Sequence, residues 1–304
     1  MEDINIIDNK KLIGLEKYFN DLVKLINSNS LPKVLMLTGK KGIGKFTLVH
    51  HLLAYNHDRK NYDQSNYTIM EKSLFLTTPK KNLYNNINYY SGEDKSVKIE
   101  NIRNLRFNLQ KTTIDNKVRF IILDDVEKFN LNCLNALLKT IEEPSVFNHF
   151  ILINNNKSSI LETIRSRSIE FKIFLSISAI NKIIKNIIDL NNIVSKIDFN
   201  RIMITPGDFI KFNNICLEND IDYDKNIIVN IRKLFNLYKI KKNYDYLDFC
   251  IFLVNKHFFD KFKKNEFNDL IISDRSLIIN KINFMKSLNL NSLSTLSDIE
   301  EILK

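Results

Sequence analysis

Two patterns of hydrophobic residues divide the chain. In the first half, short continuous apolar runs alternate with segments whose apolar residues recur every three or four positions. Continuous runs are typical of strands buried on both faces, and the longer spacing is typical of helices. We therefore expect a parallel sheet with crossover helices. The predicted strands are Val34–Thr38, Ser73–Thr77, Val118–Leu123, His149–Ile153 and Ile169–Ile173, and the predicted helices are Lys45–Tyr55, Ile99–Gln110 and Leu131–Glu142.

The third of these helices has the clearest pattern. Asn130 can cap its start and Pro144 ends it. Cys133 lies off the predicted apolar face, and the carboxylates of Glu142 and Glu143 are expected to form a solvated helix end. The predicted apolar face consists of Leu131, Leu134, Leu137, Leu138 and Ile141.

In the second half, the strand pattern fades and helical periodicity takes over, so we expect an α/β domain followed by helices. Residues 56–98 form a polar insertion that is rich in Tyr and Asn. The segment from Thr205 to Asp208, which contains Pro206 and Gly207, is typical of a turn followed by a helix start. The predicted helices are Ile177–Leu190, Phe209–Leu217, Ile227–Ile240, Tyr246–Phe262 and Ser276–Leu288.

Composition limits the class of protein. The 304 residues are 44% hydrophobic, which excludes disorder as the main state. Three widely spaced cysteines form neither a disulfide framework nor a metal site, and they are typical of a reducing cytosol. The first residues lack a signal sequence, and no apolar run is long enough for a membrane helix. We expect a cytoplasmic protein that does not engage a membrane.

The net charge is positive, with 45 Lys and Arg against 35 Asp and Glu, which gives +10. Such an excess attracts nucleic acid through counterion release. Here the lysines are dispersed, often beside acids, as A/T-rich coding would also produce. Both readings stay open, and coding bias is favoured over a dedicated nucleic-acid patch.

A glycine-rich segment follows the first predicted strand and opens the first predicted helix. Gly39, Gly42 and Gly44 let backbone N–H groups close around phosphates, and the helix N-terminus adds partial positive charge. Lys45 is expected to reach the β and γ phosphates of a nucleotide. The segment therefore predicts a P-loop that ends at Thr47, the alternative being a glycine-rich turn that binds nothing.

The magnesium position of this P-loop is altered. The pattern places Ser or Thr directly after the lysine, where its hydroxyl holds Mg²⁺, but this chain has Phe46. Thr47 comes one residue too late, which is about 100° of rotation on a helix. We therefore expect weak or vestigial binding of ATP or ADP with Mg²⁺.

Two carboxylates end the strand Val118–Leu123. Asp124 is expected to orient Mg²⁺ or its waters. In hydrolysing P-loop proteins a Glu commonly follows, whereas this chain has Asp125, whose side chain is one methylene shorter. Proton abstraction from the attacking water depends on placing the carboxylate within about an ångström, so this shorter side chain could remove most of the hydrolysis rate. The alternative is a pair of acids that caps a strand end.

Further segments carry a family resemblance. The run from Asn135 to Pro144 reads Asn-Ala-Leu-Leu-Lys-Thr-Ile-Glu-Glu-Pro, and the run from Thr163 to Ser168 reads Thr-Ile-Arg-Ser-Arg-Ser. Together with Leu12–Glu16, Ile99–Arg103 and Thr205–Gly207, they are similar in order and spacing to bacterial clamp-loader subunits of the AAA+ class. The resemblance covers about residues 10–215. It implies an AAA+ domain over 1–173, a helical lid over 174–214 and a helical collar for oligomerisation over 215–304.

Departures from the family pattern distinguish its members. The gamma/tau motor subunit normally has an intact Lys-Ser/Thr pair, an Asp-Glu pair and four zinc cysteines after the P-loop helix. This chain has Phe46 and Asp125, no Cys between residues 46 and 132, and Asp208 where the family often has a nucleotide-sensing Arg. It therefore looks like the delta-prime type, and we expect no zinc.

The resemblance also implies roles for single residues. Arg167 would be an arginine finger that reaches a neighbouring subunit's ATP and stabilises charge during phosphoryl transfer. Asn154, followed by Asn155, ends a predicted strand where AAA+ proteins place a polar sensor, although Asn is also ordinary in turns.

The assembly implied by the resemblance contains gamma/tau and delta subunits and places a sliding clamp on primed DNA. This chain would be a largely non-hydrolysing, fixed member of it. The alternatives are an active gamma/tau-type ATPase and a stand-alone DNA-binding protein on a decayed P-loop fold.

Overall fold

The computed structural model describes residues 10–76, 86–92, 99–109, 118–156, 160–263, 269–288 and 292–303. The chain forms two compact units. The first contains Met1–Asn191 and Thr205–Gly207, and the second contains Asn192–Ile204 and Asp208–Lys304.

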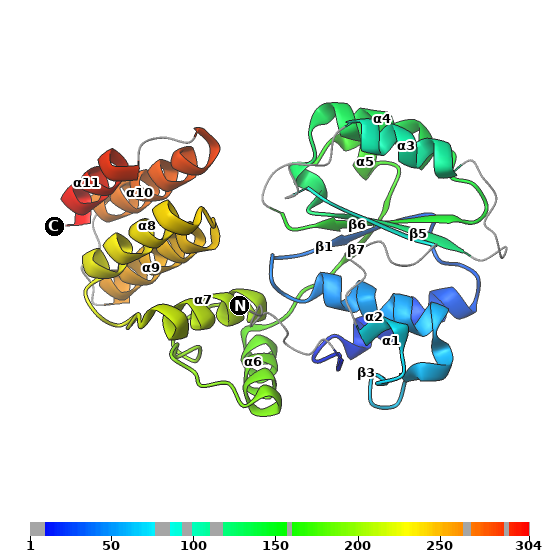
Figure 1. Ribbon diagram of the computed structural model, residues 1–304, viewed down its shortest axis with the longest axis horizontal. Coiled ribbons are helices and arrows are strands. Elements are labelled where there is room, and N and C mark those ends of the chain that lie inside the picture. The colour runs from blue at the N-terminus through cyan, green and yellow to red at the C-terminus, as the bar shows by residue number, and fades with distance from the viewer. Residues whose placement is uncertain are drawn as a thin grey trace. The chain divides into compact units, whose positions relative to one another are not determined.

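Five parallel strands form the central sheet of the first unit, in the order β4-β5-β6-β1-β7. The predicted parallel sheet is therefore confirmed. Helices α1 and α2 cover one face, and α3, α4 and α5 cover the other (Figure 1). The bounds are β1 Val34–Thr38, β4 Ile87–Ser91, β5 Arg119–Asp124, β6 Asn148–Asn154, β7 Ile169–Lys172, α1 Glu16–Asn27, α2 Lys45–His57, α3 Ile99–Leu109, α4 Leu131–Glu142 and α5 Glu162–Arg165. A small antiparallel pair joins β2 (Tyr62–Asp63) and β3 (Thr68–Ile69).

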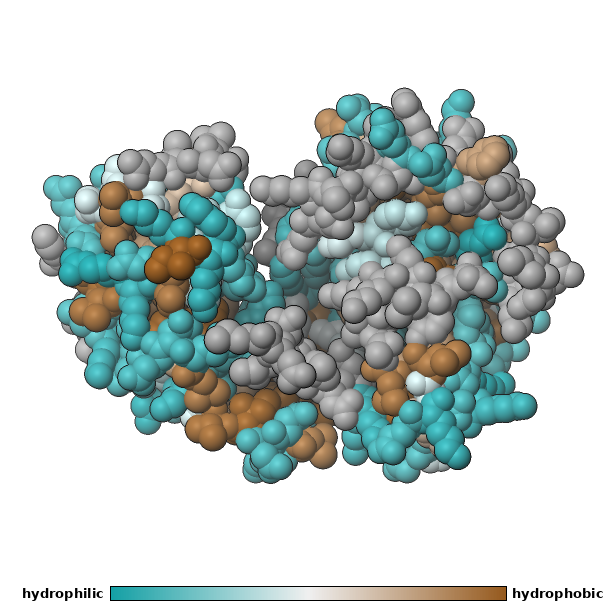
Figure 2. Space-filling view, in the orientation of Figure 1, coloured by the Kyte–Doolittle hydropathy of each residue, from teal (hydrophilic) through white to brown (hydrophobic). Residues whose placement is uncertain are grey.

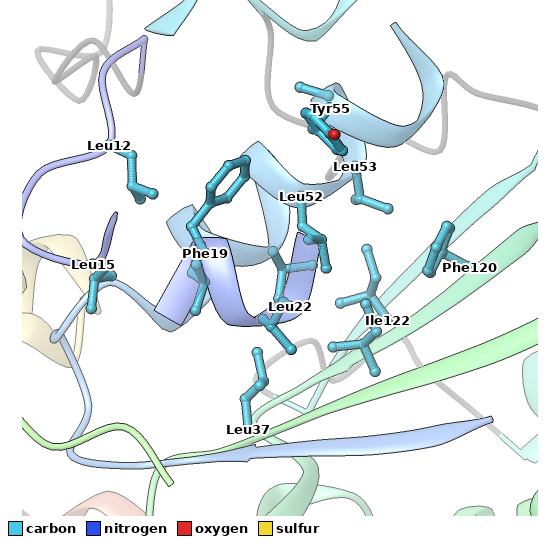
Figure 3. Close-up of a cluster of buried hydrophobic side chains, with 14 of the residues drawn as sticks. Leu12, Leu15, Phe19, Leu22, Leu37, Leu52, Leu53, Tyr55, Phe120 and Ile122 are labelled. Carbon is cyan, nitrogen blue, oxygen red and sulfur yellow. The ribbon is translucent and has the colours of Figure 1, made fainter. Parts of the chain in front are cut away.

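The apolar strands are buried because each face of the sheet has its own core. Leu37 of β1 and Ile122 of β5 pack toward α1 and α2, with Phe19 and Leu52 from those helices (Figure 3). The alternate positions of the same strands pack toward α3 and α4. Side chains of successive strand residues point to opposite faces, so a strand covered on both faces must be apolar throughout.

Two elements of the first unit differ from the prediction around residues 56–98. Ser73–Thr77 is not a strand, because Leu74–Leu76 forms a single 3-10 turn, and Thr77 lies outside the described residues. The hydroxyl of Ser73 accepts the N–H of Phe75 and donates to Asp58, so it caps a turn. The edge strand β4 instead comes from the part of the polar insertion that was assigned no strand.

Helix α4 begins and ends as predicted, but its buried face is different. Cys133 is 1% exposed and belongs to the core, whereas Leu131 is 61% exposed. The Asn130 side chain accepts the Cys133 N–H, as an N-cap does. The prediction that Cys133 lies off the apolar face was therefore wrong. The reason is that the buried side follows residues 133, 134, 137 and 141, which turns Leu131 outward.

In the rest of the described chain every regular element is a helix, as expected. Within the second unit, α8 packs on α9, α9 on α10, α10 on α11, and α11 on α8. On the face presented in Figure 2, the coloured residues are mostly hydrophilic, and hydrophobic residues occur in groups between them. None of the helices that the structure describes combines the length and apolar character needed to cross a membrane. The bounds are α6 Ile177–Asn191, α7 Pro206–Asn219, α8 Ile227–Lys241, α9 Asp245–Lys263, α10 Asp269–Leu288 and α11 Ser292–Leu303.

Candidate functional site

The predicted P-loop follows an interior strand of the sheet. Strand β1 lies between β6 and β7, and its carboxyl end leads through the glycine-rich segment into α2. Gly42 and Gly44 have φ angles of +81° and +95°, which side-chain-bearing residues rarely adopt. The turn therefore has the tight backbone that phosphate-binding loops need, at the edge where open parallel sheets place their ligands.

The lysine of the loop is engaged within the loop itself. Lys45 is 3% exposed, and its Nζ donates hydrogen bonds of 2.7 Å to the carbonyl oxygens of Gly39 and Lys40. Burial lowers the pKa of Lys45 from 10.5 to about 8, and the carboxylates of Asp124 and Glu127 oppose that shift. Glu127 was not predicted from the sequence. It could have been found from its position one short turn after the strand-end acids Asp124 and Asp125.

Tyr89 contacts both Phe46, the altered magnesium position, and Asp124, the expected one. The ring of Phe46 meets the ring of Tyr89 edge-on, with centroids 5.3 Å apart. The Tyr89 hydroxyl donates a 2.9 Å hydrogen bond to Oδ2 of Asp124, whose Oδ1 accepts the N–H of Asp125. Burial, together with the charge of Asp124, raises the pKa of Tyr89, so Tyr89 is protonated at neutral pH and acts as a donor.

The second acid is also held in place. Asp125 is 4% exposed with a left-handed φ of +51°, and its Oδ1 accepts a 2.7 Å hydrogen bond from Nδ2 of Asn155. The backbone N–H of Asn155 donates to both carboxylate oxygens of Glu127. Asn154, the predicted sensor residue, instead bonds to Asn156 in a local turn. The structure therefore brings Asn155, and not Asn154, to the acids.

The predicted helix start near residue 206 meets the P-loop directly. The N–H of Gly207 donates a 2.8 Å hydrogen bond to the carbonyl oxygen of Gly42. A Cβ at Gly207 would come within 2.8 Å of the Gly42 Cα. Thr47 is half-buried on α2. The two glycines thus allow a backbone-to-backbone contact at the mouth of the loop.

The residues fit a phosphate-binding turn in backbone shape and fit a magnesium-bound nucleotide poorly. Phe46 has no ligand atom, and Asp124 already accepts hydrogen bonds from Tyr89 and from the backbone. Mg²⁺ takes oxygen ligands in near-ideal octahedral geometry. Within the described ranges, no group of three or more His, Cys, Asp and Glu side chains could hold a metal ion.

Arg167 lies away from this site, in the turn that follows α5. Its Nε donates a 2.7 Å hydrogen bond to Oε1 of Glu142, and Nη2 pairs with the same oxygen. Its Nη1 donates to the carbonyl oxygen of Thr163 at 2.8 Å. The side chain is 34% exposed, so the guanidinium reaches the surface although these contacts hold it. Sequence reasoning had treated Glu142 as a solvated helix end and missed this contact.

The three cysteines are buried and free, as their spacing suggested. Burial raises the pKa of Cys216 to about 12 and also raises the pKa of Cys133 and Cys250. A thiol with a raised pKa is a poor nucleophile and a poor metal ligand at neutral pH.

Comparison with known proteins decides the family. Residues 14–175, more than half of the chain, match the model of the family described as DNA polymerase III, delta subunit. The chain belongs to this family. The match spans β1, the P-loop, both strand-end acids and Arg167, so the resemblance to bacterial clamp-loader subunits is confirmed.

Individual relatives of this DNA polymerase III family member are named as gamma, tau or delta' subunits. The chain is 31% identical over 168 residues to DNA polymerase III subunit gamma of Buchnera aphidicola subsp. Schizaphis graminum, an alignment that covers 54% of this chain and 44% of that protein. It is 33% identical over 78 residues to subunit delta' of Pseudomonas aeruginosa, which covers 25% and 24%. The chain therefore aligns with half or less of the length of these relatives.

A solved structure supports the fold of the whole chain. The chain resembles a DNA polymerase III gamma subunit-related protein of Thermotoga maritima, with a TM-score of 0.50 at 15% identity. The superposition covers 95% of this chain and 98% of that one. With the parallel sheet, the P-loop and the C-terminal helices, this confirms the expected AAA+ fold class.

Proposed function

We propose that the chain is the delta-prime-type subunit of a bacterial clamp loader. It acts in the cytoplasm with gamma/tau and delta subunits to place a sliding clamp on primer-template DNA. In that assembly it hydrolyses little or no ATP itself and supplies Arg167 in trans to a neighbouring subunit's ATP. Residues 174–214 serve as its lid and 215–304 as its collar.

The arrangement of Phe46, Tyr89 and Asp124 carries this proposal. The side chain that would supply a magnesium-binding hydroxyl is an aromatic ring, and the carboxylate that would orient magnesium accepts a hydrogen bond from a buried tyrosine. Lys45 is bonded within its own loop. A site of this kind supports a structural use of the P-loop.

The exposed guanidinium of Arg167 supports the second part of the proposal. It is always charged, planar and able to bond two oxygens of a phosphate at once, whereas a lysine offers a single point charge. Arginine fingers of this kind contribute roughly 10³–10⁵ in rate. A side chain near the surface can serve a neighbouring molecule, which a buried one cannot.

A gamma/tau-type ATPase is the second candidate, because the longest sequence matches are to gamma subunits. The two candidates predict different results for the isolated chain. An ATPase motor turns over ATP in a magnesium-dependent manner, and a delta-prime-type subunit does not.

The decisive test uses the loader reconstituted with gamma/tau and delta subunits from the same source. The DNA- and clamp-stimulated ATPase rate is compared for the native chain and Arg167→Ala, with assembly checked by size-exclusion chromatography. We expect Arg167→Ala to lower the rate at least about tenfold with assembly intact. An unchanged rate would exclude a finger role for Arg167.

A further inference from the structure

The guanidinium of Arg167 is held by groups from two separate elements. Glu142, the last residue of α4, accepts from Nε and Nη2 through one oxygen. The carbonyl oxygen of Thr163, in α5, accepts from Nη1, and the Ser166 hydroxyl lies 3.4 Å from the same nitrogen. Contacts on both edges fix the plane of the guanidinium as well as its position.

This arrangement leaves donors for another ligand. A guanidinium carries five N–H donors. Glu142 uses the Nε hydrogen and one on Nη2, and Thr163 uses one on Nη1. Two donors stay available along the end of the group: the second hydrogen on Nη2 and the second on Nη1. The latter is at most weakly shared with Ser166. An anion can therefore bind there while Glu142 keeps its contact.

Glu142 occupies a position that a helix by itself disfavours for an acid. The carboxyl end of a helix carries partial negative charge, so a carboxylate in the last turn is unfavourable and a cation is favourable. The positive charge of Arg167 offsets that repulsion. Because both side chains are partly exposed, the pair adds little to the stability of the fold. Its effect falls on the conformation of Arg167.

We propose that Glu142 is a positioning residue that orders Arg167 for a phosphate group of the neighbouring subunit's nucleotide. The proposal rests on the finger role given to Arg167 under the proposed function. A long, flexible side chain loses rotamer freedom on binding, and the carboxylate removes that freedom beforehand. Glu142 thus acts through Arg167 and does not itself touch the nucleotide.

Glu143 provides a matched control. It is the next residue, it is exposed, and in the described part of the chain it makes no bond to Arg167. Glu142→Gln and Glu143→Gln remove the same charge from the same helix end. A general electrostatic effect changes both variants equally, whereas positioning of Arg167 affects the first alone.

The experiment measures the stimulated ATPase of the reconstituted loader with the native chain, Glu142→Gln, Glu143→Gln, Arg167→Ala and the double variant Glu142→Gln/Arg167→Ala. Misplacement by about an ångström can cost as much as a hundredfold, so we expect Glu142→Gln to lower kcat about tenfold with KM for ATP unchanged. Glu143→Gln should equal the native chain. In the Arg167→Ala background, Glu142→Gln should have no further effect.

The outcomes separate this inference from the proposed function. A slow Arg167→Ala variant together with a native-like Glu142→Gln overturns the positioning role and leaves the finger role standing. An additional loss from Glu142→Gln in the Arg167→Ala background shows that Glu142 acts elsewhere, which also overturns it. A native rate for Arg167→Ala removes the finger role itself.

Discussion

The hydroxyl of Tyr89 in β4 and Oδ2 of Asp124 in β5 lie 2.9 Å apart and share a hydrogen bond between adjacent parallel strands. In β4, the residue paired with Asp124 is Ser91, and Tyr89 precedes Ser91 by two residues. The Tyr89 side chain therefore lies on the same face of the sheet as that of Asp124 and reaches along the strand to it. The bond engages the carboxylate that the sequence assigns to magnesium. The Tyr89 ring also lies against Phe46, the altered magnesium position.

Restoring the magnesium ligands should increase nucleotide affinity. In the double variant Phe46→Thr/Tyr89→Phe, a hydroxyl follows Lys45 and Asp124 loses its tyrosine partner. We expect magnesium-dependent ATP affinity to rise about tenfold over the native chain, which corresponds to about 1.4 kcal/mol. Isothermal titration with Mg²⁺ and with EDTA measures the difference.

The single variants serve as its controls. Phe46→Thr alone keeps the Tyr89–Asp124 bond, and Tyr89→Phe alone keeps the aromatic ring at the ligand position. Each should gain less than the double variant. Equal affinity in all four proteins would show that the tyrosine does not limit magnesium binding.

Acid should destabilise the first unit through His50. Burial lowers the pKa of His50 from 6.5 to about 4, so between these pH values the unfolded chain binds a proton that the folded chain does not. The stability that the neutral ring contributes is present above pH 6.5 and is lost as the pH falls to 4, by about 3 kcal/mol in total. Urea denaturation between pH 7 and 4.5 measures this dependence.

Substitution of His50 tests the assignment. His50→Leu should flatten the acid dependence of the unfolding free energy. Leu53→Ala, in the same helix, should lower that free energy by about 2–5 kcal/mol at every pH, because it removes buried carbon and no titrating group. A native pH slope in His50→Leu would assign the acid sensitivity to other groups.

The N-cap of α4 should control the stability of its first turn. Asn130→Ala removes the acceptor that the Cys133 N–H uses at 2.8 Å, at a cost of about 1 kcal/mol. The Cys133 amide should then exchange with deuterium roughly fivefold faster. Asn132→Ala, an exposed neighbour within the same helix, should leave that rate unchanged. Faster exchange in both variants would argue against a specific cap.

The contact between Gly207 and Gly42 should not tolerate a side chain. A Cβ on Gly207 would lie 2.8 Å from the Gly42 Cα, and backbone cannot yield as a flexible side chain does. Gly207→Ala should therefore break the 2.8 Å hydrogen bond at a cost of about 1–3 kcal/mol, and Gly207→Val should cost more. Faster hydrogen exchange at the residue 207 amide checks the loss. Equal protection in all three proteins would show that the contact adapts.

Much of the fold could be predicted because it rests on local patterns. The strand Val34–Thr38 and the helix Leu131–Glu142 have the predicted bounds, since continuous apolar runs and capped amphipathic helices record burial directly in the sequence. The edge strand Ile87–Ser91 was missed because only one of its residues is fully buried. Polar and aromatic residues on an edge strand leave no apolar run to recognise.

The candidate site, like the fold, has features that were predictable from the sequence and features that were not. The sequence by itself predicted the P-loop and the paired acids, because each is a short run whose chemistry depends on adjacent residues. Its family resemblance also identified Arg167 as the candidate finger. Only the tertiary structure decided that Tyr89 engages Asp124, that Asn155 reaches Asp125 and that Glu142 holds Arg167. These partners are 25 to 35 residues apart in the chain. Strand pairing and helix packing bring them together, and no local pattern encodes which distant side chains will meet.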